Sequence, residues 1–166
     1  MKKAPKTAKK RETPKEGIKP IRVRKQPGAI HTTSYWLNRP VDDEHLDWNY
    51  PGNWIDGYWE SQEHPHRKLI LDVLGGLESF NSLAEVGCNC GPNLALIQKS
   101  YPGINLAGTD VDERVISRAK EELRNVDLQV GNVLKLPWNT QSFDVLIADA
   151  VLMYLTPEEV KTGLDE

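Results

Sequence analysis

Four short apolar runs, separated by stretches with helical periodicity, dominate the second half of the chain. Each run has the length of a buried strand, and they lie at residues 83–86, 104–108, 126–130 and 143–148. After each of the first two runs, apolar residues recur on one helix face: Leu94, Ala95 and Ile97, and then Val115, Ile116, Ala119 and Leu123. This order of elements predicts an α/β fold, a doubly wound parallel sheet with crossover helices.

Further helices are predicted on both sides of this unit. Before the first strand, Ser61 is a suitable N-cap residue, and five apolar residues follow at helical spacing: Leu69, Ile70, Val73, Leu74 and Leu77. Asp112 is in position to cap the helix after the second strand. After the fourth strand, Thr156 to Glu159 forms a capping box with proline at the first helical position, so another helix is expected there.

Charge and aromatic content divide the chain into three parts. Residues 1–30 hold eleven of the 21 lysines and arginines and two of the 24 acids, a net charge of +9, whereas residues 31–166 carry −12. We expect a disordered basic arm over residues 1–30. Such an arm could attract nucleic acid through counterion release, but it has no aromatic side chains to stack on bases, so we favour a solubilising tail.

Residues 31–60 are rich in aromatic side chains. Four of the five tryptophans lie here, together with Tyr35, Tyr50 and Tyr58, while prolines and glycines interrupt any long period. We therefore expect irregular chain that either packs an N-terminal extension onto the domain or acts as a lid over a ligand. The third part, residues 61–166, contains the predicted sheet.

Composition argues against several classes of protein. No apolar run approaches the roughly 20 residues of a membrane span, and the N-terminus lacks the apolar core of a secretion signal, so no membrane partner is expected. Cys88 and Cys90 are too close together to staple a fold and too few for a zinc site. His64 and His66 have no third ligand nearby in the sequence, so no metal is expected. A reducing, cytoplasmic location is the default.

The candidate site lies where the predicted strands end. Ligands of parallel sheets bind at the carboxyl ends of the strands, which here are followed by residues 85–91, 110–111, 131–134 and 149. The first stretch turns sharply into a helix opened by Pro92, and would direct free backbone N–H groups and the helix dipole at an anionic group. Glu85 beside it favours an ammonium or a hydroxyl group instead, so a ligand with both signs of charge is expected.

These stretches resemble the motifs of class I S-adenosylmethionine-dependent methyltransferases, of the small-molecule or broad-substrate type. The similar segments are the acid-and-glycine motif at residues 85–91, the acid Asp110 after the second strand, the adenine loop at residues 131–137, and the fourth strand with its following segment at residues 143–155. The resemblance runs from about residue 61 to residue 159. It implies a Rossmann-like methyltransferase fold and S-adenosylmethionine as the cofactor.

The resemblance also implies which residues bind the cofactor. Glu85 would orient the ammonium of the methionine end, directly or through water, N–H groups of the turn and of the following helix would meet its carboxylate, and Asp110 would accept both ribose hydroxyls. Asn132 would accept the adenine amino group through its side-chain oxygen, Val133 would donate its N–H, and Leu134 would lie against the base. The full set of implied cofactor-binding residues is Glu85, Gly87, Cys88, Asn89, Gly91, Asp110, Val111, Asn132, Val133, Leu134 and Asp149.

Asp149 and Tyr154 are the candidate catalytic residues, because they lie where the family places substrate-side groups. Methyl transfer from a sulfonium is an in-line displacement, so positioning contributes most, and a general base is needed only if the acceptor arrives protonated. The alternatives are that Asp149 caps a turn and that Tyr154 packs in the core. The segment after the fourth strand lacks the Pro-Pro-aromatic run of nucleobase amino-methyltransferases, which favours a small-molecule acceptor.

The sequence departs from the family pattern in three places and stops early. Asn89 replaces a glycine, for which asparagine is suitable because it tolerates left-handed conformations; Asn132 replaces an aspartate; and Tyr154 stands where histidine is frequent. Four of about seven family strands are present, so the fourth strand would be an open edge. We expect a truncated methyltransferase; a partner or oligomer covering that edge, and a reduced binding module, are the alternatives.

Two other functions are compatible with parts of the sequence. A nicotinamide-dependent dehydrogenase shares the sheet and the acid after the second strand, but residues 87–92 lack its Gly-x-Gly-x-x-Gly fingerprint. A non-enzymatic module could instead dock on nucleic acid through residues 1–30.

Overall fold

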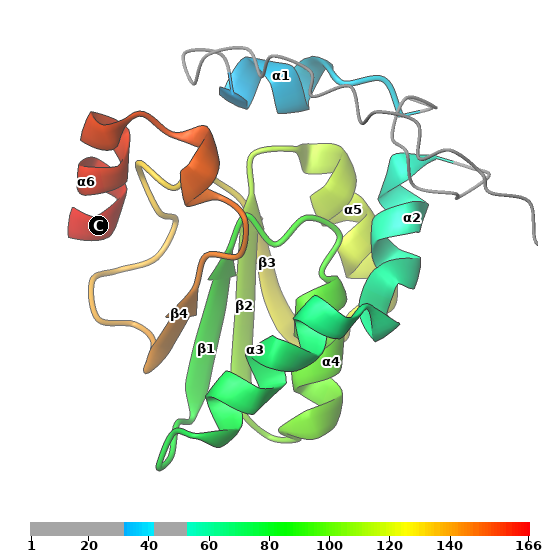
Figure 1. Cartoon of the computed structure of the whole chain (residues 1–166), viewed down its shortest axis with the longest axis vertical. Coiled ribbons are helices and arrows are strands. Elements are labelled where there is room, and N and C mark those ends of the chain that lie inside the picture. Colours follow the sequence, from blue (N-terminus) through cyan, green and yellow to red (C-terminus); the bar gives the residue numbers. More distant parts are fainter. Residues whose placement is uncertain (1–31, 42–52) are drawn as a thin grey trace, which may run out of the picture.

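A computed structural model describes residues 32–41 and 53–166 (Figure 1). The basic arm at residues 1–30, and Trp48 and Tyr50 of the aromatic segment, lie outside these ranges. The helices are α1 (Thr32–Asn38), α2 (Trp54–Glu60), α3 (Pro65–Gly75), α4 (Pro92–Ser100), α5 (Glu113–Glu122) and α6 (Pro157–Asp165). The strands are β1 (Ser82–Val86), β2 (Asn105–Asp110), β3 (Val126–Val130) and β4 (Val145–Ile147), and 3₁₀ turns occupy Ser61–Glu63 and Leu152–Tyr154.

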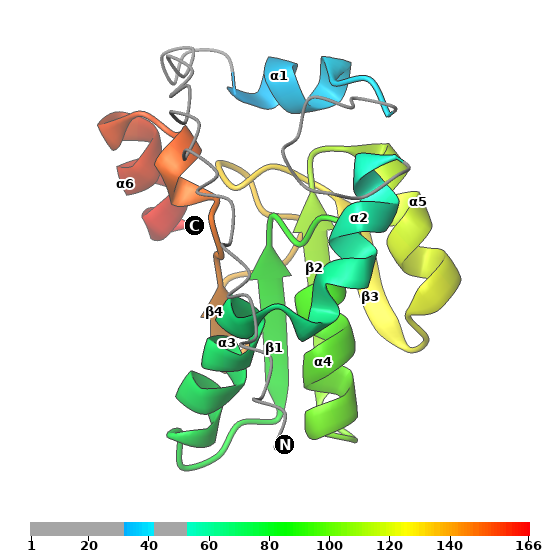
Figure 2. The same cartoon turned by 45° about the vertical axis from the view of Figure 1, so that its right-hand side comes forward.

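The strands form one parallel sheet in the order β3-β2-β1-β4. Leu83 at the centre of this sheet is opposite Leu106 on β2 and Val145 on β4. Figures 1 and 2 show α3 and α4 on one face of the sheet, while α1 lies beyond the carboxyl ends of β1 and β2 in both views. The predicted α/β fold with a parallel sheet and crossover helices is therefore confirmed.

Local signals located most elements correctly. The strand over residues 126–130 has the predicted bounds, and Asp112 caps α5 by accepting from the Arg114 N–H at 2.9 Å. Both bonds of the Thr156 capping box are present, with Glu159 N to Thr156 Oγ1 at 3.2 Å and Thr156 N to Glu159 Oε2 at 2.8 Å. Asn89 has φ +51°, the left-handed conformation that its side chain makes tolerable.

The fourth strand is shorter than predicted, because the side chain of Asp144 bonds to the backbone at the start of β1. Its carboxylate accepts hydrogen bonds from the backbone N–H groups of Asn81 and Ser82, at 2.7 and 2.9 Å, where a longer strand would continue the ladder. Pairing of β4 with β1 is thus limited to three residues of each strand. Within the described residues β4 has no second neighbour in the sheet, and Leu146 on it is exposed; whether a partner or oligomer covers this edge stays a prediction.

The helix predicted before the first strand is present as α3, but two other predictions about the segment before the sheet were wrong. Ser61 does not cap the first long helix: it ends α2, and His64 is the N-cap of α3, accepting from the His66 N–H. Of the apolar residues whose spacing predicted this helix, Leu69, Val73 and Leu77 are exposed and Leu74 is buried. Residues 32–38 and 54–60 are helical rather than irregular.

Close packing around Gly108 in β2 gives a prediction about stability. A Cβ atom at Gly108 would lie 2.7 Å from Leu94 Cδ1 and 2.9 Å from Cys88 Sγ, whereas one at Gly75 would meet nothing closer than the Tyr101 hydroxyl at 3.8 Å. We expect Gly108→Ala to lower the free energy of unfolding by about 1–3 kcal/mol. Gly75→Ala, the control, should raise it by up to about 1 kcal/mol. Urea unfolding measures both; equal effects of the two substitutions would contradict this packing.

Candidate functional site

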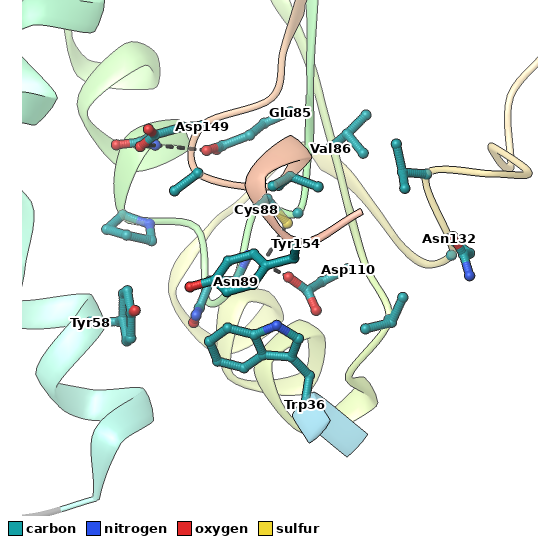
Figure 3. A pocket seen from close by; sticks show the side chains of 18 of the residues that line it. Trp36, Tyr58, Glu85, Val86, Cys88, Asn89, Asp110, Asn132, Asp149 and Tyr154 are labelled. Carbon is teal, nitrogen blue, oxygen red and sulfur yellow. Dashed lines mark hydrogen bonds between the residues drawn. The ribbon is translucent and has the colours of Figure 1, made fainter. Parts of the chain in front are cut away.

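A cavity of about 320 Å³ lies at the carboxyl ends of the strands (Figure 3). Glu85 at the end of β1, Asp110 at the end of β2 and Asn132 after β3 all line it, as do Asp149 and Tyr154 after β4. The structure therefore brings together residues from the loops after all four strands. Gly87, Cys88, Asn89, Val111 and Val133 of the predicted set also line this cavity.

Two residues of the predicted set, Gly91 and Leu134, do not line the cavity. Gly91 caps α4 with φ +82°, and a Cβ atom there would lie 2.6 Å from Leu123 Cδ1, so its small size lets α4 and α5 approach. The Leu134 N–H donates to Asn132 Oδ1 at 2.9 Å. The Asn132 side-chain oxygen, which was predicted to accept from adenine, therefore already accepts a hydrogen bond within its own loop.

Glu85 is buried with only one of its two carboxyl oxygens bonded. Its side chain is 2% exposed, and Oε1 accepts from Asn93 Nδ2 at 2.7 Å. Oε2 has no hydrogen-bond partner among the described residues. Burial raises the pKa of Glu85 to about 8, although the Asn93 bond and the charge of Arg67 act in the opposite direction.

Asn93 and Arg67 form the support behind Glu85. The sequence did not point to Asn93, and it offered Arg67 only as a possible partner of a ligand carboxylate. Asn93 Oδ1 accepts from Arg67 Nη1 at 2.7 Å, and Asn93 Nδ2 also lies 3.2 Å from Asp149 Oδ2. Arg67 Nε and Nη2 donate to the carbonyl and hydroxyl oxygens of Ser61 at 2.7–3.2 Å. From the sequence, Arg67 could either reach a ligand carboxylate or lie on an exposed helix face, and we favoured the exposed face. It is 4% exposed and lines the cavity, so the exposed position is wrong.

The backbone N–H groups of the turn at residues 87–91 are not free. The N–H groups of Gly87 and Cys88 both donate to the carbonyl oxygen of Thr109, at 2.7 and 3.0 Å. The next three residues of the turn donate to Asp110 Oδ2, Asn89 Oδ1 and the Cys88 carbonyl oxygen. The expectation that the turn itself directs several free N–H groups at an anion is thus wrong, while the part of it that concerns the N–H groups of the following helix stays a prediction. Arg67 is a described cation whose charge acts on Glu85.

Asp110 is fixed by the two loops on either side of it. Oδ2 accepts from the Asn89 N–H at 2.9 Å, and Oδ1 accepts from the Asp112 N–H at 3.1 Å. Burial raises the pKa of Asp110, while these backbone bonds lower it. A carboxylate has about four acceptor positions, so both oxygens keep capacity for a ligand in the cavity.

Aromatic rings form the wall of the cavity opposite these acids. Trp36 from α1, Tyr58 from α2 and Tyr154 line it, and the rings of Trp36 and Tyr154 are perpendicular with centroids 5.6 Å apart (Figure 3). Trp54, 5% exposed, lies behind Trp36 at 6.0 Å. The aromatic segment therefore supplies both packing and a cavity wall. The tryptophan content of this segment indicated a contact with a ligand or with the domain, but it did not identify Trp36 and Tyr58 as the residues that line the cavity.

His66 and Asp149 meet at the side of the cavity nearest α3. His66 Nε2 lies 3.4 Å from Asp149 Oδ2, and both residues line the cavity. Burial and the charge of Arg67 lower the pKa of His66, while Asp149 raises it. Within the described ranges, no three histidine, cysteine, aspartate or glutamate side chains are placed to hold a metal ion. None of the described helices is long and apolar enough to cross a bilayer.

Comparisons with known proteins agree on one family. The model of the methyltransferase domain family matches residues 83–166. An uncharacterized protein of Haemophilus influenzae is 30% identical over 123 residues, which cover 69% of this chain and 49% of that protein. A trans-aconitate 2-methyltransferase of Variovorax paradoxus is 25% identical over 114 residues, 69% of this chain and 42% of the relative. The chain thus spans about half the length of the curated relatives it matches.

Solved structures show the same fold. The plantazolicin methyltransferase BpumL, in complex with a pentazolic desmethylPZN analog and SAH, matches with a TM-score of 0.61 and 18% identity, over 82% of this chain and 52% of its own. Human N-acetylserotonin methyltransferase in complex with SAM matches with a TM-score of 0.55 and 20% identity, over 68% of this chain and 32% of its own. At these identities the likeness extends to the Rossmann-like methyltransferase fold.

The raised pKa of Glu85 predicts that the protein loses stability as the pH rises. In the unfolded chain this carboxyl ionises near pH 4.5, whereas the folded protein keeps it protonated to about pH 8. Between these values the folded state binds more protons, so the free energy of unfolding falls by up to about 1.4 kcal/mol per pH unit. Urea unfolding at a series of pH values measures the fall.

The matched control is Glu85→Gln, which resembles the protonated carboxyl and does not titrate. The variant and the wild type should be similar in stability near pH 5, and the variant should be the more stable near pH 9. If both proteins lose stability equally over this range, Glu85 is not the group responsible.

Proposed function

Because the chain belongs to the methyltransferase domain family, we propose that it is part of an S-adenosylmethionine-dependent methyltransferase whose cofactor binds in the cavity described above. The observation that carries the proposal is the meeting of Glu85, Asp110 and Asn132 around one cavity, although they come from the ends of β1 and β2 and from the loop after β3 (Figure 3). A nucleoside with a zwitterionic tail has a suitable group for each of these side chains.

The methionine end of the cofactor fits the buried charges at the end of β1. Glu85 Oε2 is a buried acceptor without a partner in the described residues, and an ammonium group would supply the missing donor. Arg67 uses three of its five N–H groups on Ser61 and Asn93. The cofactor's carboxylate would therefore pair with Arg67, in place of the turn N–H groups first expected.

The nucleoside end fits the loops after β2 and β3. Asp110 would accept the two ribose hydroxyls, with Val111 beside the sugar. Asn132 keeps its amide N–H₂ group for the base, because its oxygen is bonded to the Leu134 N–H, and Val133 lines the cavity next to it. We therefore assign adenine recognition to the Asn132 amide nitrogen and to the Val133 backbone.

S-Adenosylmethionine supplies, when bound, a methyl group on a positively charged sulfur. The chain's own residues then have to place an acceptor in line with that group and exclude water. We assign the acceptor side to Tyr154 and Asp149, with Trp36 and Tyr58 as the aromatic wall. Asp149 would remove a proton where the acceptor arrives protonated, and His66, 3.4 Å away, would stabilise either charge state of that carboxyl.

The acceptor is proposed to be a small molecule. The name of the Variovorax relative gives a small organic acid as its substrate, and aromatic rings form one wall of the described cavity. The basic arm at residues 1–30 keeps its proposed role as a solubilising tail, and the cytoplasmic location remains a prediction from the sequence.

Replacing the acid at the end of β2 tests the proposed cofactor directly. We expect Asp110→Ala to weaken the binding of S-adenosylhomocysteine by about 100-fold or more, because charge-assisted bonds to two hydroxyls are lost. Isothermal titration calorimetry measures the affinity, and far-UV circular dichroism checks the fold. Asp72→Ala, which removes an exposed acid from α3 outside the cavity lining, should bind like the wild type. Equal affinity of Asp110→Ala and wild type would contradict the assignment.

Binding should also release a proton from Glu85. At pH 7 the free protein holds this carboxyl protonated, since its pKa is about 8, whereas pairing with an ammonium requires the ionised form. We expect close to one proton to be released per S-adenosylhomocysteine bound at about pH 7. Titration calorimetry in buffers of different ionisation enthalpy measures this number. Glu85→Gln should abolish the release; a release that persists in the variant would assign the proton to another group.

A further inference from the structure

We propose that Arg114 is a positioning residue that holds α1 over the cavity and couples the placement of this helix to ligand contact at Asp110. Arg114 lies on α5 and does not line the cavity, so it is outside the set of residues assigned to the cofactor or the acceptor. The proposal rests on the proposed function only for the choice of ligand in its test.

Arg114 binds the C-terminal end of α1. Its Nη2 donates to the Trp36 carbonyl oxygen at 3.0 Å, and its Nη1 donates to the Arg39 carbonyl oxygen at 2.7 Å. The last carbonyl groups of a helix lack partners within the helix, and a cation is favourable there. Trp36, whose backbone is held in this way, is also the α1 side chain that contacts the ring of Tyr154 in the aromatic wall of the cavity (Figure 3).

Asp112 fixes the direction of the Arg114 guanidinium. Both carboxyl oxygens of Asp112 accept from Arg114 Nε, at 2.9 and 3.1 Å, and Oδ2 also accepts from Nη2 at 2.6 Å. The side chain of Asp112 is 4% exposed, so this contact is shielded from solvent on one side. Arginine is suited to the position because its planar fork can bind a carboxylate and two carbonyl oxygens at once, which a lysine ammonium cannot do in the same geometry.

The same segment reaches the acid at the end of β2. The Asp112 N–H donates to Asp110 Oδ1 at 3.1 Å, and Asp110 Oδ2 is bonded to the Asn89 N–H. A ligand that binds Asp110 therefore contacts a connected series of hydrogen bonds. The series runs from Asp110 through Asp112 and Arg114 to the carbonyl oxygens at the C-terminal end of α1. If the ligand stabilises the held position of α1, the held position must strengthen ligand binding by the same factor.

Trp54 anchors the chain just after α1 independently of Arg114. Its indole Nε1 donates to the Pro40 carbonyl oxygen at 2.9 Å, and its backbone N–H donates to the Val41 carbonyl oxygen at 3.2 Å. Loss of Arg114 should thus release α1 while residues 40–41 stay in place and the sheet remains folded. This makes the proposal testable with folded variants.

Amide hydrogen exchange of the full chain, followed by mass spectrometry, tests the proposal. Without ligand, we expect residues 33–39 to exchange at least about tenfold faster in Arg114→Gln than in wild type. Arg114→Lys should also be faster, because it retains the charge but loses the fork. Lys120→Gln, the control, removes a positive charge from an exposed position on the same helix and should leave the exchange of α1 unchanged.

The ligand arm of the experiment adds S-adenosylhomocysteine. It should slow the exchange of residues 33–39 in wild type but not in Arg114→Gln, whose affinity should fall by about three- to tenfold. Unchanged α1 exchange in Arg114→Gln would overturn the proposal, and so would an equal acceleration throughout α5, which would indicate general loosening. If wild type does not bind S-adenosylhomocysteine, the proposed function fails, while the ligand-free comparison still decides whether Arg114 holds α1.

Discussion

A buried carboxyl group needs partners for its oxygens, and this requirement at Glu85 organises the end of the sheet. One oxygen is bonded to Asn93 on α4, Asn93 is bonded to Arg67 on α3, and Arg67 is bonded to Ser61 after α2. Elements that are far apart in sequence are thus fixed around the end of β1 by polar contacts. Burial of an incompletely bonded carboxyl is unfavourable, and the raised pKa of Glu85 reflects this. The unbonded oxygen is the basis of the proposed preference for a cationic group.

The other parts of the site follow from the parallel sheet. Because the four strands run in one direction, their following loops meet at one edge, and the polar groups in these loops bond to one another. Asp110 is the clearest case, since it closes the loops on both sides of it while it lines the cavity. The aromatic segment then covers this edge, with Trp54 as its buried anchor and Trp36 as its contact with the cavity. Groups that stabilise the loops therefore also define the shape of the site.

The sequence predicted what depends on neighbouring residues and missed what depends on distant ones. The Asp112 and Thr156 caps and the strand at residues 126–130 were correct, because caps and strand patterns are local. Arg67 was expected in solvent, yet it is buried and donates to Asn93. The sequence did not reveal this contact, because Asn93 lies 26 residues further along the chain. The turn N–H groups were expected to be free, yet those of Gly87 and Cys88 donate to the Thr109 carbonyl oxygen. This bond could not be predicted locally, because Thr109 belongs to another strand. Gly57 suggested irregular chain but lies within α2, since tertiary packing of Trp54 and Ile55 overrides the low helix propensity of glycine.

The central claim is that loops from all four strands bind one nucleoside ligand together. The most direct test is a titration of the ¹⁵N-labelled chain with S-adenosylhomocysteine, observed by NMR at each backbone amide. We expect the amides of residues 85–89, 110–112, 132–133 and 149–151 to shift together and to report the same dissociation constant. Shifts confined to one of these loops, or different dissociation constants for different loops, would contradict it.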